Sequence, residues 1–348
     1  MTQKRRRAIQ GATIRDVAAS AGVSPMTVSR VINKDPGVRA TTRAQVEAAI
    51  KELRYAPSAA ARSLAGSTPC RVGLLYDNPS TSYLNEFLVG ALDASSHTGA
   101  QVMVEKCIDT ESADVALAKL LQAGVDGLIL PPPLCEFAQV HKQVRLSGKP
   151  TVAVAAGRPL TGIATIRIDN EAAAHDMTRH LLQLGHRRFG FIKGHPNQIS
   201  SEQRLNGFLA AVKDAGIRRT AVRIEQGYFT YRSGLKAAEK LLSGKPRPTA
   251  IFAANDDMAS AAMSLAHRLG LDVPADVSIV GFDDTPMASA IWPSLTTVHQ
   301  PIADMARMAM DLLLEEIRRK RHHDSNQPGQ LLQPYRIIIR ESSGPAPV

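Results

Sequence analysis

The sequence predicts two parts: an all-α helix-turn-helix headpiece, followed by an α/β core of two doubly wound parallel-sheet lobes. Three observations predict this division. Residues 1 to 66 hold twelve Lys or Arg against four Asp or Glu, and so carry +8 of the chain's net charge of +10. Three short amphipathic segments lie between residues 13 and 55. From residue 71 onward, short apolar runs alternate with helical stretches.

The stretch TIRDVAASAGVSPMTVSRVI, residues 13 to 32, predicts two short helices joined by a turn. The first apolar face ends at Gly22, which breaks the helical run. Ser24 is a good N-cap, and Pro25 suits the first position of the second helix. A third helix is expected over residues 41 to 55, and together the three make a helix-turn-helix domain. A basic domain of this kind favours nucleic acid as its partner.

The core is expected to contain parallel sheets covered by helices on both faces, because right-handed βαβ crossovers produce that arrangement. The expected strands are residues 71 to 76, 101 to 106, 127 to 130, 151 to 155, 189 to 192, 222 to 227, 250 to 254 and 277 to 282. Two sets of strands imply two similar lobes, and the break between them falls near residues 166 to 173. Ligands of such folds bind beyond the carboxyl ends of the strands.

Polar and aromatic side chains follow these strand ends or open the next helix, where a ligand cleft is expected. The candidates for effector binding are Asp77, Tyr83, Asp169, Ser200, Arg204, Phe229, Asn255, Asp256 and Asp283. Each one alone is most often a helix cap, and capping explains Asp256 as well as ligand contact does. Arginine and carboxylate side chains can hold neighbouring hydroxyl groups, and an aromatic ring can pack against a sugar ring.

Several classes of protein are disfavoured. The basic start is not followed by the apolar segment of a signal peptide, and no run of 18 apolar residues could span a bilayer. The three cysteines are far apart, so neither a zinc site nor a disulfide framework is indicated. Phosphate-loop, dinucleotide, nucleophile-elbow and metalloprotease motifs are absent from the sequence. We therefore expect a cytoplasmic binding protein with no catalytic residue, metal, cofactor or membrane partner.

Two quoted stretches carry a resemblance to a known family. TIRDVAASAGVSPMTVSRVINKDPGV and TRAQVEAAIKELRYAPSAAARSLAG resemble the headpiece and hinge of the LacI/GalR family of bacterial transcription regulators. The likeness continues through GHRRFGFI, SSEQRLNGF, NDDMASAA, VPADVSIVGFDD and LTTVHQP. It implies a core like that of periplasmic sugar-binding proteins, in a cytoplasmic repressor of carbohydrate genes.

The resemblance also implies domain limits and crossings of the chain between the lobes. The expected parts are a basic flexible tail (1 to 11), a helix-turn-helix domain (12 to 57), a hinge helix (58 to 66) and a core (70 to 345). Lobe 1 is expected to comprise residues 70 to 168 and 301 to 330, and lobe 2 residues 169 to 297 and 331 to 345.

For DNA, the resemblance implies that the second helix enters the major groove of a pseudo-palindromic operator. The expected contacts are Ser24, Pro25, Met26, Thr27, Ser29, Arg30 and Asn33. Arg30 has the fork that pairs with guanine, whereas Pro25 and Met26 offer only apolar contact or shape. In the hinge, Arg62 is expected to reach a phosphate and Leu64 to wedge into a base step of the minor groove.

For the core, the resemblance implies a homodimer and an effector cleft. Lobe 1 is expected to supply most of the dimer interface, with the helix at residues 83 to 95 as one candidate surface. The purine-responsive branch of the family has an arginine and an aromatic residue where this chain has Gln198 and Leu84. These departures favour a mono- or oligosaccharide, acting as an inducer. The alternatives are a nucleoside or other non-sugar corepressor, and a sugar-binding protein without DNA function.

Overall fold

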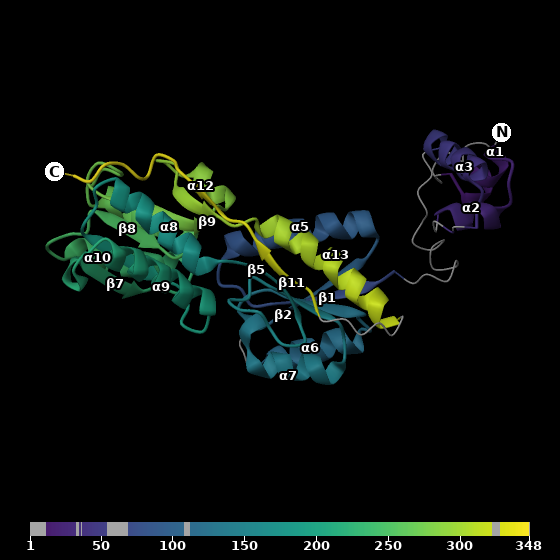
Figure 1. Cartoon of the computed structure of the whole chain (residues 1–348), viewed down its shortest axis with the longest axis horizontal. Coiled ribbons are helices and arrows are strands. Elements are labelled where there is room, and N and C mark those ends of the chain that lie inside the picture. The colour runs from purple at the N-terminus through teal and green to yellow at the C-terminus, as the bar shows by residue number, and fades with distance from the viewer. Residues whose placement is uncertain are drawn as a thin grey trace, which may run out of the picture. The chain divides into compact units, whose positions relative to one another are not determined.

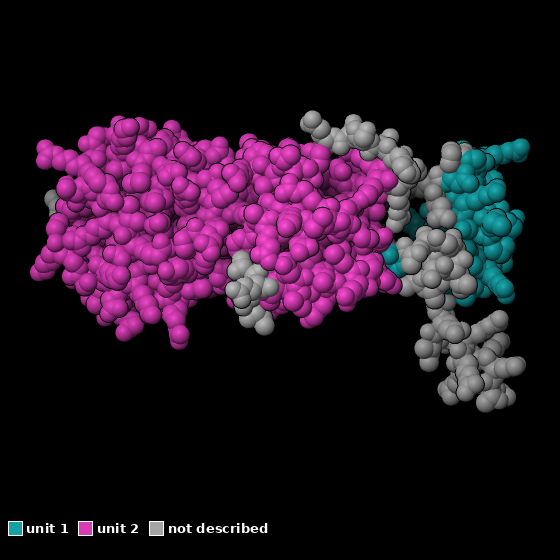
Figure 2. All heavy atoms as spheres, turned by 90° about the horizontal axis from the view of Figure 1, so that it is seen from below, with its two compact units in different colours: residues 1–69 teal, residues 70–348 magenta. Residues whose placement is uncertain are grey.

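The computed structural model describes residues 12–32, 35, 37–53, 69–107, 112–321 and 328–347. The chain divides into two compact units, residues 1–69 and residues 70–348, which Figure 2 distinguishes by colour. Three predictions from the sequence concern residues outside the described ranges: the basic tail, the hinge helix with Arg62 and Leu64, and Asn33.

The first unit contains three helices, α1 (Ile14–Ser20), α2 (Pro25–Ile32) and α3 (Ala40–Glu52). Thr13 begins α1 with a capping box, in which its Oγ1 accepts from the N–H of Asp16 and its own N–H donates to the Asp16 carboxylate. Ser24 caps α2, because its Oγ accepts a hydrogen bond from the N–H of Thr27 at 3.1 Å. The three helices enclose a small core of Val17, Ala18, Val28, Val31, Val46 and Ala49. The predicted helix-turn-helix fold is confirmed.

The second unit consists of two lobes, each built on a six-stranded sheet (Figure 1). The lobe 1 sheet has the order β11-β5-β4-β3-β1-β2, and all of its pairs are parallel. Its strands are β1 (Arg71–Tyr76), β2 (Gln101–Lys106), β3 (Gly127–Leu130), β4 (Thr151–Val154), β5 (Ala164–Ile168) and β11 (Gln330–Gln333). Its helices are α5 (Thr81–Thr98), α6 (Ala113–Gln122), α7 (Ala138–Ser147) and α13 (Ile302–Arg321), with a 3-10 turn at Leu134–Glu136. Helices α5 and α13 pack on each other and α6 contacts α7, so the sheet is covered on both faces.

The lobe 2 sheet has the order β12-β10-β9-β8-β6-β7, in which only the β10–β12 pair is antiparallel. Its strands are β6 (Phe189–Lys193), β7 (Val222–Gln226), β8 (Ala250–Ala253), β9 (Ser278–Asp283), β10 (Thr296–His299) and β12 (Arg336–Ile338). Its helices are α8 (Asn170–Gln183), α9 (Ile199–Asp214), α10 (Tyr231–Ser243), α11 (Asp256–Arg268) and α12 (Pro286–Ala290), with a 3-10 turn at Arg219–Ala221. Helix α8 packs on α9, and α10 packs on α11.

The chain crosses between the lobes three times. The first crossing joins β5 to α8, the second joins β10 to α13, and the third joins β11 to β12. The sequence placed the third crossing at residues 330 to 331, but β11 pairs with β5 through Gln333, so it lies at residues 334 and 335. The eight predicted strands are present, and β5, β10, β11 and β12 were missed. These four are three to five residues long and flank the crossings, where the alternation of strand and helix that guided the prediction ends.

Candidate functional site

A polar cleft lies between the two lobes of the second unit. It is bounded by loops and helix starts that follow the carboxyl ends of β1, β3, β4, β6, β7, β8 and β9. The lining residues are Asn78, Ser80, Tyr83, Pro132, Ala155, Asn170, Gln198, Ser200, Arg204, Phe229, Asn255, Asp283 and Gln300. This is the place that the doubly wound topology predicts for a ligand.

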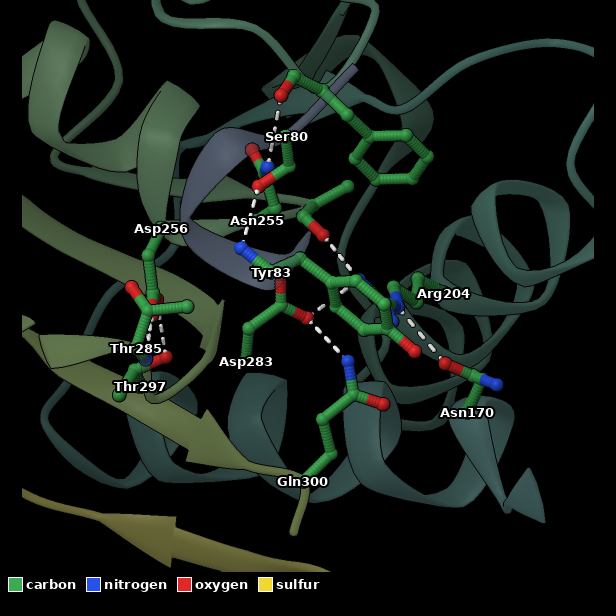
Figure 3. Close-up of polar contacts among 12 residues, drawn as sticks. Ser80, Tyr83, Asn170, Arg204, Asn255, Asp256, Asp283, Thr285, Thr297 and Gln300 are labelled. Carbon is green, nitrogen blue, oxygen red and sulfur yellow. Dashed lines mark hydrogen bonds and ion pairs between the residues drawn. The ribbon is translucent and has the colours of Figure 1, made fainter. Parts of the chain in front are cut away.

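Arg204, from the second turn of α9, is the central charged group of the cleft (Figure 3). Its Nε donates to Asn170 Oδ1 at 2.9 Å, and its Nη1 donates to the carbonyl oxygen of Ala254 at 2.6 Å. The same Nη1 lies 3.4 Å from Asp283 Oδ1. The guanidinium carbon lies 3.5 Å from the ring centroid of Phe282, a cation–π contact. The side chain is therefore held in one orientation by contacts on several sides.

Burial controls the protonation of this pair. Arg204 and Asp283 are 5 % and 3 % exposed. Burial lowers the pKa of Arg204, and the neighbouring Asp283 carboxylate opposes that shift. Burial, together with the charge of Asp257, raises the pKa of Asp283 to about 7, although Arg204 and the 2.6 Å hydrogen bond from Gln300 Nε2 oppose the rise. Near neutral pH, Asp283 can therefore either accept or donate a hydrogen bond.

Backbone strain is concentrated at this cleft. Among the described residues, the non-glycine positions with positive φ are Ala155 (53°), Phe229 (60°), Asp283 (117°) and Asp284 (56°). Three of them line the cleft, and the fourth follows Asp283 directly. Such conformations cost about 1 to 3 kcal/mol each and persist where the surrounding structure enforces them, which is typical of ligand sites.

In the headpiece, α2 exposes both polar and apolar side chains to solvent. Pro25 and Arg30 are exposed, Met26 is 68 % exposed and Ser29 is half-buried. The Arg30 guanidinium makes a long ion pair of 3.8 Å with Asp35 and keeps 64 % of its side chain exposed. Ser24 and Thr27 bond to each other at 2.9 Å at the start of the helix. The side chains that the sequence predicts to contact DNA from α2 are therefore accessible or partly accessible to solvent.

Comparison with known proteins assigns both units. The family described as "Bacterial regulatory proteins, lacI family" matches residues 13–58, and "Periplasmic binding protein-like domain" matches residues 178–343. The HTH-type transcriptional repressor PurR of Proteus mirabilis (strain HI4320) is 40 % identical over 318 residues, covering 89 % of this chain and 92 % of the relative. PurR of Escherichia coli O1:K1 / APEC is 35 % identical, covering 97 % and 98 %.

The chain belongs to the lacI family of bacterial regulatory proteins. Among solved structures, the CelR–cellobiose complex is 31 % identical, with a TM-score of 0.70 and coverage of 95 % of this chain and 99 % of the other. The lac repressor dimer bound to operator and an anti-inducer is 30 % identical, with a TM-score of 0.71 and coverage of 96 % and 100 %. This LacI-family protein is therefore a DNA-binding repressor, as the headpiece motif indicated.

The repressor's cleft contains six of the nine effector residues proposed from the sequence: Tyr83, Ser200, Arg204, Phe229, Asn255 and Asp283. Asn255 also caps α11, because its Oδ1 accepts from the N–H of Met258 at 3.0 Å. The aromatic ring of Phe229 lies directly on Gly194, where an added Cβ would come within 2.0 Å of it. Glycine at position 194 therefore leaves room for that ring.

The structure places the other three candidates outside the lining. Asp169 is the N-cap of α8 and accepts from the N–H of Ala172 at 3.0 Å. Asp256 accepts hydrogen bonds from Thr285 and Thr297 and faces away from Arg204 (Figure 3). Asp77 lies near His195: burial lowers the pKa of that imidazole, and the Asp77 charge opposes the shift. Capping and packing, the ordinary roles of polar residues after strands, explain the first two.

Sequence reasoning missed several lining residues as ligand contacts: Ser80, Pro132, Ala155, Asn170 and Gln300. Asn78 and Gln198 also line the cleft: the strand-end rule indicated Asn78, which directly follows β1, and the family resemblance singled out position 198. Gln300 and Asn170 lie at the lobe crossings, where no strand end was expected. Leu84, one of the two departures from the purine-responsive branch, is not among the lining residues, whereas Gln198 is.

The raised pKa of Asp283 predicts a pH-dependent stability. Between about pH 4 and pH 7 the folded chain keeps a proton that the unfolded chain has lost, so the free energy of unfolding falls as the pH rises through this window. The steepest slope is about 1.4 kcal/mol per pH unit, with no further change from this group above about pH 8. Urea titrations of wild type and Asp283→Asn, subtracted at each pH, measure it. The exposed Asp311→Asn variant is the control, and a flat difference would contradict the assignment.

Proposed function

We propose that this repressor binds a pseudo-palindromic operator as a homodimer and that a small polar metabolite in the interlobe cleft controls that binding. The observation that supports it best is the buried Arg204–Asp283 pair, which lines the cleft where the backbone is strained. The same chain also has a DNA-reading headpiece. A buried charged pair next to an aromatic ring is suited to a ring-shaped ligand with hydrogen-bonding groups on its edge.

For the effector, we favour the second of the two possibilities left by the sequence, a nucleoside or other non-sugar corepressor. The PurR relatives, at 35 to 40 % identity over most of the chain, support it over a saccharide. The cleft offers donors from Arg204 and Gln300 and an acceptor from Asp283, and the faces of Tyr83 and Phe229 suit a planar ring. A corepressor strengthens operator binding because it binds the operator-bound conformation more tightly.

A saccharide stays the second candidate, because the CelR structure is a cellobiose complex. The presence of Gln198 in the lining, where the purine-responsive branch has an arginine, supports it as well. Amide and carboxylate side chains can hydrogen-bond the hydroxyl groups of a sugar as well as the polar edge of a planar ring. The two candidate ligands therefore differ in the affinity that each would show, and not in the type of contact that the cleft offers.

We propose that the dimer forms through the outer surface of lobe 1. Val89 and Leu92, three residues apart on α5, are each 58 % exposed, and Val104 of the edge strand β2 is 44 % exposed. Helix α5 contacts β2, so these exposed apolar side chains belong to two neighbouring elements of lobe 1. Phe87 and Ala91, by contrast, are buried within lobe 1. A two-fold dimer matches the symmetry of a pseudo-palindromic operator.

We further propose that the cleft binds its ligand without chemical change and that the protein acts in the cytoplasm, where the operator is. His186 supports this proposal, since its ring bonds to Thr249, Ser278 and the carbonyl of Gly344 inside lobe 2 and is fully buried. Within the described ranges, no cluster of three metal-binding side chains is found, and no helix is apolar and long enough to traverse a bilayer.

Replacing Arg30 tests the DNA-reading face. Arg30→Ala should lower the affinity for a DNA site selected by the wild-type protein by about 10- to 100-fold, because a bidentate contact to guanine is lost. Binding to random DNA should change far less, and Met26→Ala should shift base preference instead. Fluorescence anisotropy at fixed salt measures both, with the exposed Lys51→Ala on α3 as control. Wild-type affinity in Arg30→Ala would exclude this face as the DNA reader.

Titration calorimetry with two ligand panels tests the effector class. We expect binding of purine bases or nucleosides, such as hypoxanthine and guanosine, and no binding of glucose or cellobiose. Phe229→Leu should weaken the binding by about 2- to 10-fold, because one aromatic contact is lost. The same ligand should tighten operator binding in the anisotropy assay. Binding of the sugars alone would reverse the order of the two candidates.

Sedimentation velocity tests the dimer surface. The double variant Val89→Lys/Leu92→Lys should sediment as a monomer at concentrations where wild type is a dimer, because it would bury two charges. Leu146→Lys on α7, a position that is 73 % exposed, is the matched control and should stay dimeric. A dimeric double variant would place the interface elsewhere.

A further inference from the structure

The start of α9 is attached to lobe 1 through a single carboxylate. Glu136, in the 3-10 turn after β3, accepts a hydrogen bond from the N–H of Ile199 at 2.7 Å through Oε2. Its other oxygen accepts from the N–H of Gly157, within lobe 1, at 2.9 Å. Ile199 is the first residue of α9, so a carboxylate from one lobe occupies the positive end of a helix in the other. Both oxygens are thereby used, one on each side of the lobe boundary.

Gly157 is the second half of the same contact. Its carbonyl oxygen accepts from Gln203 Nε2, one turn further along α9, at 2.6 Å. A Cβ added at Gly157 would lie 2.4 Å from Cγ2 and 2.5 Å from Cβ of Ile199. Because the Cβ of Ile199 is fixed to the backbone, no change of rotamer could relieve that overlap. The lobes approach this closely only because residue 157 has no side chain.

These four residues, Glu136, Gly157, Ile199 and Gln203, are called the interlobe clasp below. Helix α9 connects the clasp directly to the cleft, since Gln198, Ser200 and Arg204 all line it. Any movement that separates Ile199 from Glu136 also withdraws these side chains from Tyr83 and Ser80 of lobe 1. The clasp and the ligand contacts therefore form or break together.

We propose that Glu136 and Gly157 are positioning residues of the repressor: through the clasp they hold the lobes closed over the effector and carry part of the coupling between the cleft and operator binding. Neither residue lines the cleft, so their effect on the effector is exerted through α9. The proposal rests on the proposed function for the identity of the ligand and its effect on DNA. The clasp itself can be tested without any ligand.

A carboxylate is required because the clasp needs two acceptors. In Glu136→Gln the amide offers one acceptor oxygen and turns an NH₂ group toward the other N–H, so one of the two bonds is lost. Burial raises the pKa of Glu136, and the N–H groups of Ile199 and Gly157, with the charge of Arg158, oppose that shift. The exposed Glu202, in the first turn of the same helix, supplies a matched control because it lies outside the clasp.

Hydrogen–deuterium exchange of the full-length protein, resolved to single amides, tests the clasp in the absence of ligand. In Glu136→Gln the amide that loses its acceptor, either Ile199 or Gly157, should exchange about 10- to 100-fold faster than in wild type, the range expected when a hydrogen bond to a charged group is lost. Glu202→Gln should leave both rates unchanged. Unchanged rates at both amides in Glu136→Gln, with the fold intact by circular dichroism, would overturn the proposal.

Exchanging the small and the large residue between positions 157 and 199 tests the close approach of the two lobes. Gly157→Ala should accelerate exchange at amide 199 by at least about tenfold, because the new methyl group forces the lobes apart. In Gly157→Ala/Ile199→Gly both overlapping atoms of residue 199 are gone, so the rate, corrected for sequence, should return to within about threefold of Ile199→Gly alone. If amide 199 still exchanges rapidly in the double variant, Gly157 is required for the structure of lobe 1 itself and not for the clasp.

Ligand and operator measurements then separate the two proposals. With the effector found by calorimetry, Glu136→Gln should bind it about 10- to 100-fold more weakly, and the ratio of operator affinities with and without effector should fall toward one. Operator affinity without effector is the internal check on the headpiece. If wild type binds no ligand in the cleft while the exchange results hold, the effector proposal fails and the clasp stands. Full coupling in Glu136→Gln, despite faster exchange, would remove its role in regulation.

Discussion

The buried guanidinium of Arg204 is the constraint on which the cleft depends. A cation taken out of water must be paired and hydrogen-bonded, and removing one partner of such a pair costs about 3 to 5 kcal/mol. Here the partners come from the start of α8, the end of β8 and the end of β9, with the ring of Phe282 beside it. The hydrogen bonds and the ion pair of this one side chain therefore hold three chain segments in place. The strained backbone at Asp283 and Asp284 lies where those segments meet.

This arrangement also explains why the cleft is polar although the lobes on both sides of it are apolar. The strands behind it are almost entirely buried, as in β8 and β9, where every residue lies in the core. The polar atoms of the cleft lie at strand ends, in the loops beyond them and in the first turns of the following helices, where their hydrogen bonds can be completed by one another and by a ligand. Asp256 shows the alternative outcome, because its carboxylate is already satisfied by Thr285 and Thr297 and serves to hold the end of β9 near β10.

Much of this could be predicted from the sequence, because strand periodicity locates strand ends and parallel topology gathers those ends along one edge. Arg204 and Asp283 were found in this way. Asp256 and Asp169 satisfy the same rule but lie outside the lining of the cleft, since residue type and position cannot tell a helix cap or a packing contact from a ligand contact. Glu136 and Gly157 could not be found at all: their importance depends on a contact with Ile199, which is 63 residues from Glu136 along the chain. A close approach between segments that are far apart in the chain produces no periodic pattern in the sequence around either of them, so the sequence does not reveal it.

The three crossings between the lobes have a mechanical consequence. One connection alone would let the lobes swivel and slide, whereas three connections restrict these movements. Tyr335 strengthens this restriction at the third crossing, where its hydroxyl donates to Asp176 of α8 at 2.7 Å. The two lobes are therefore less free to rotate against each other than a single connection would leave them.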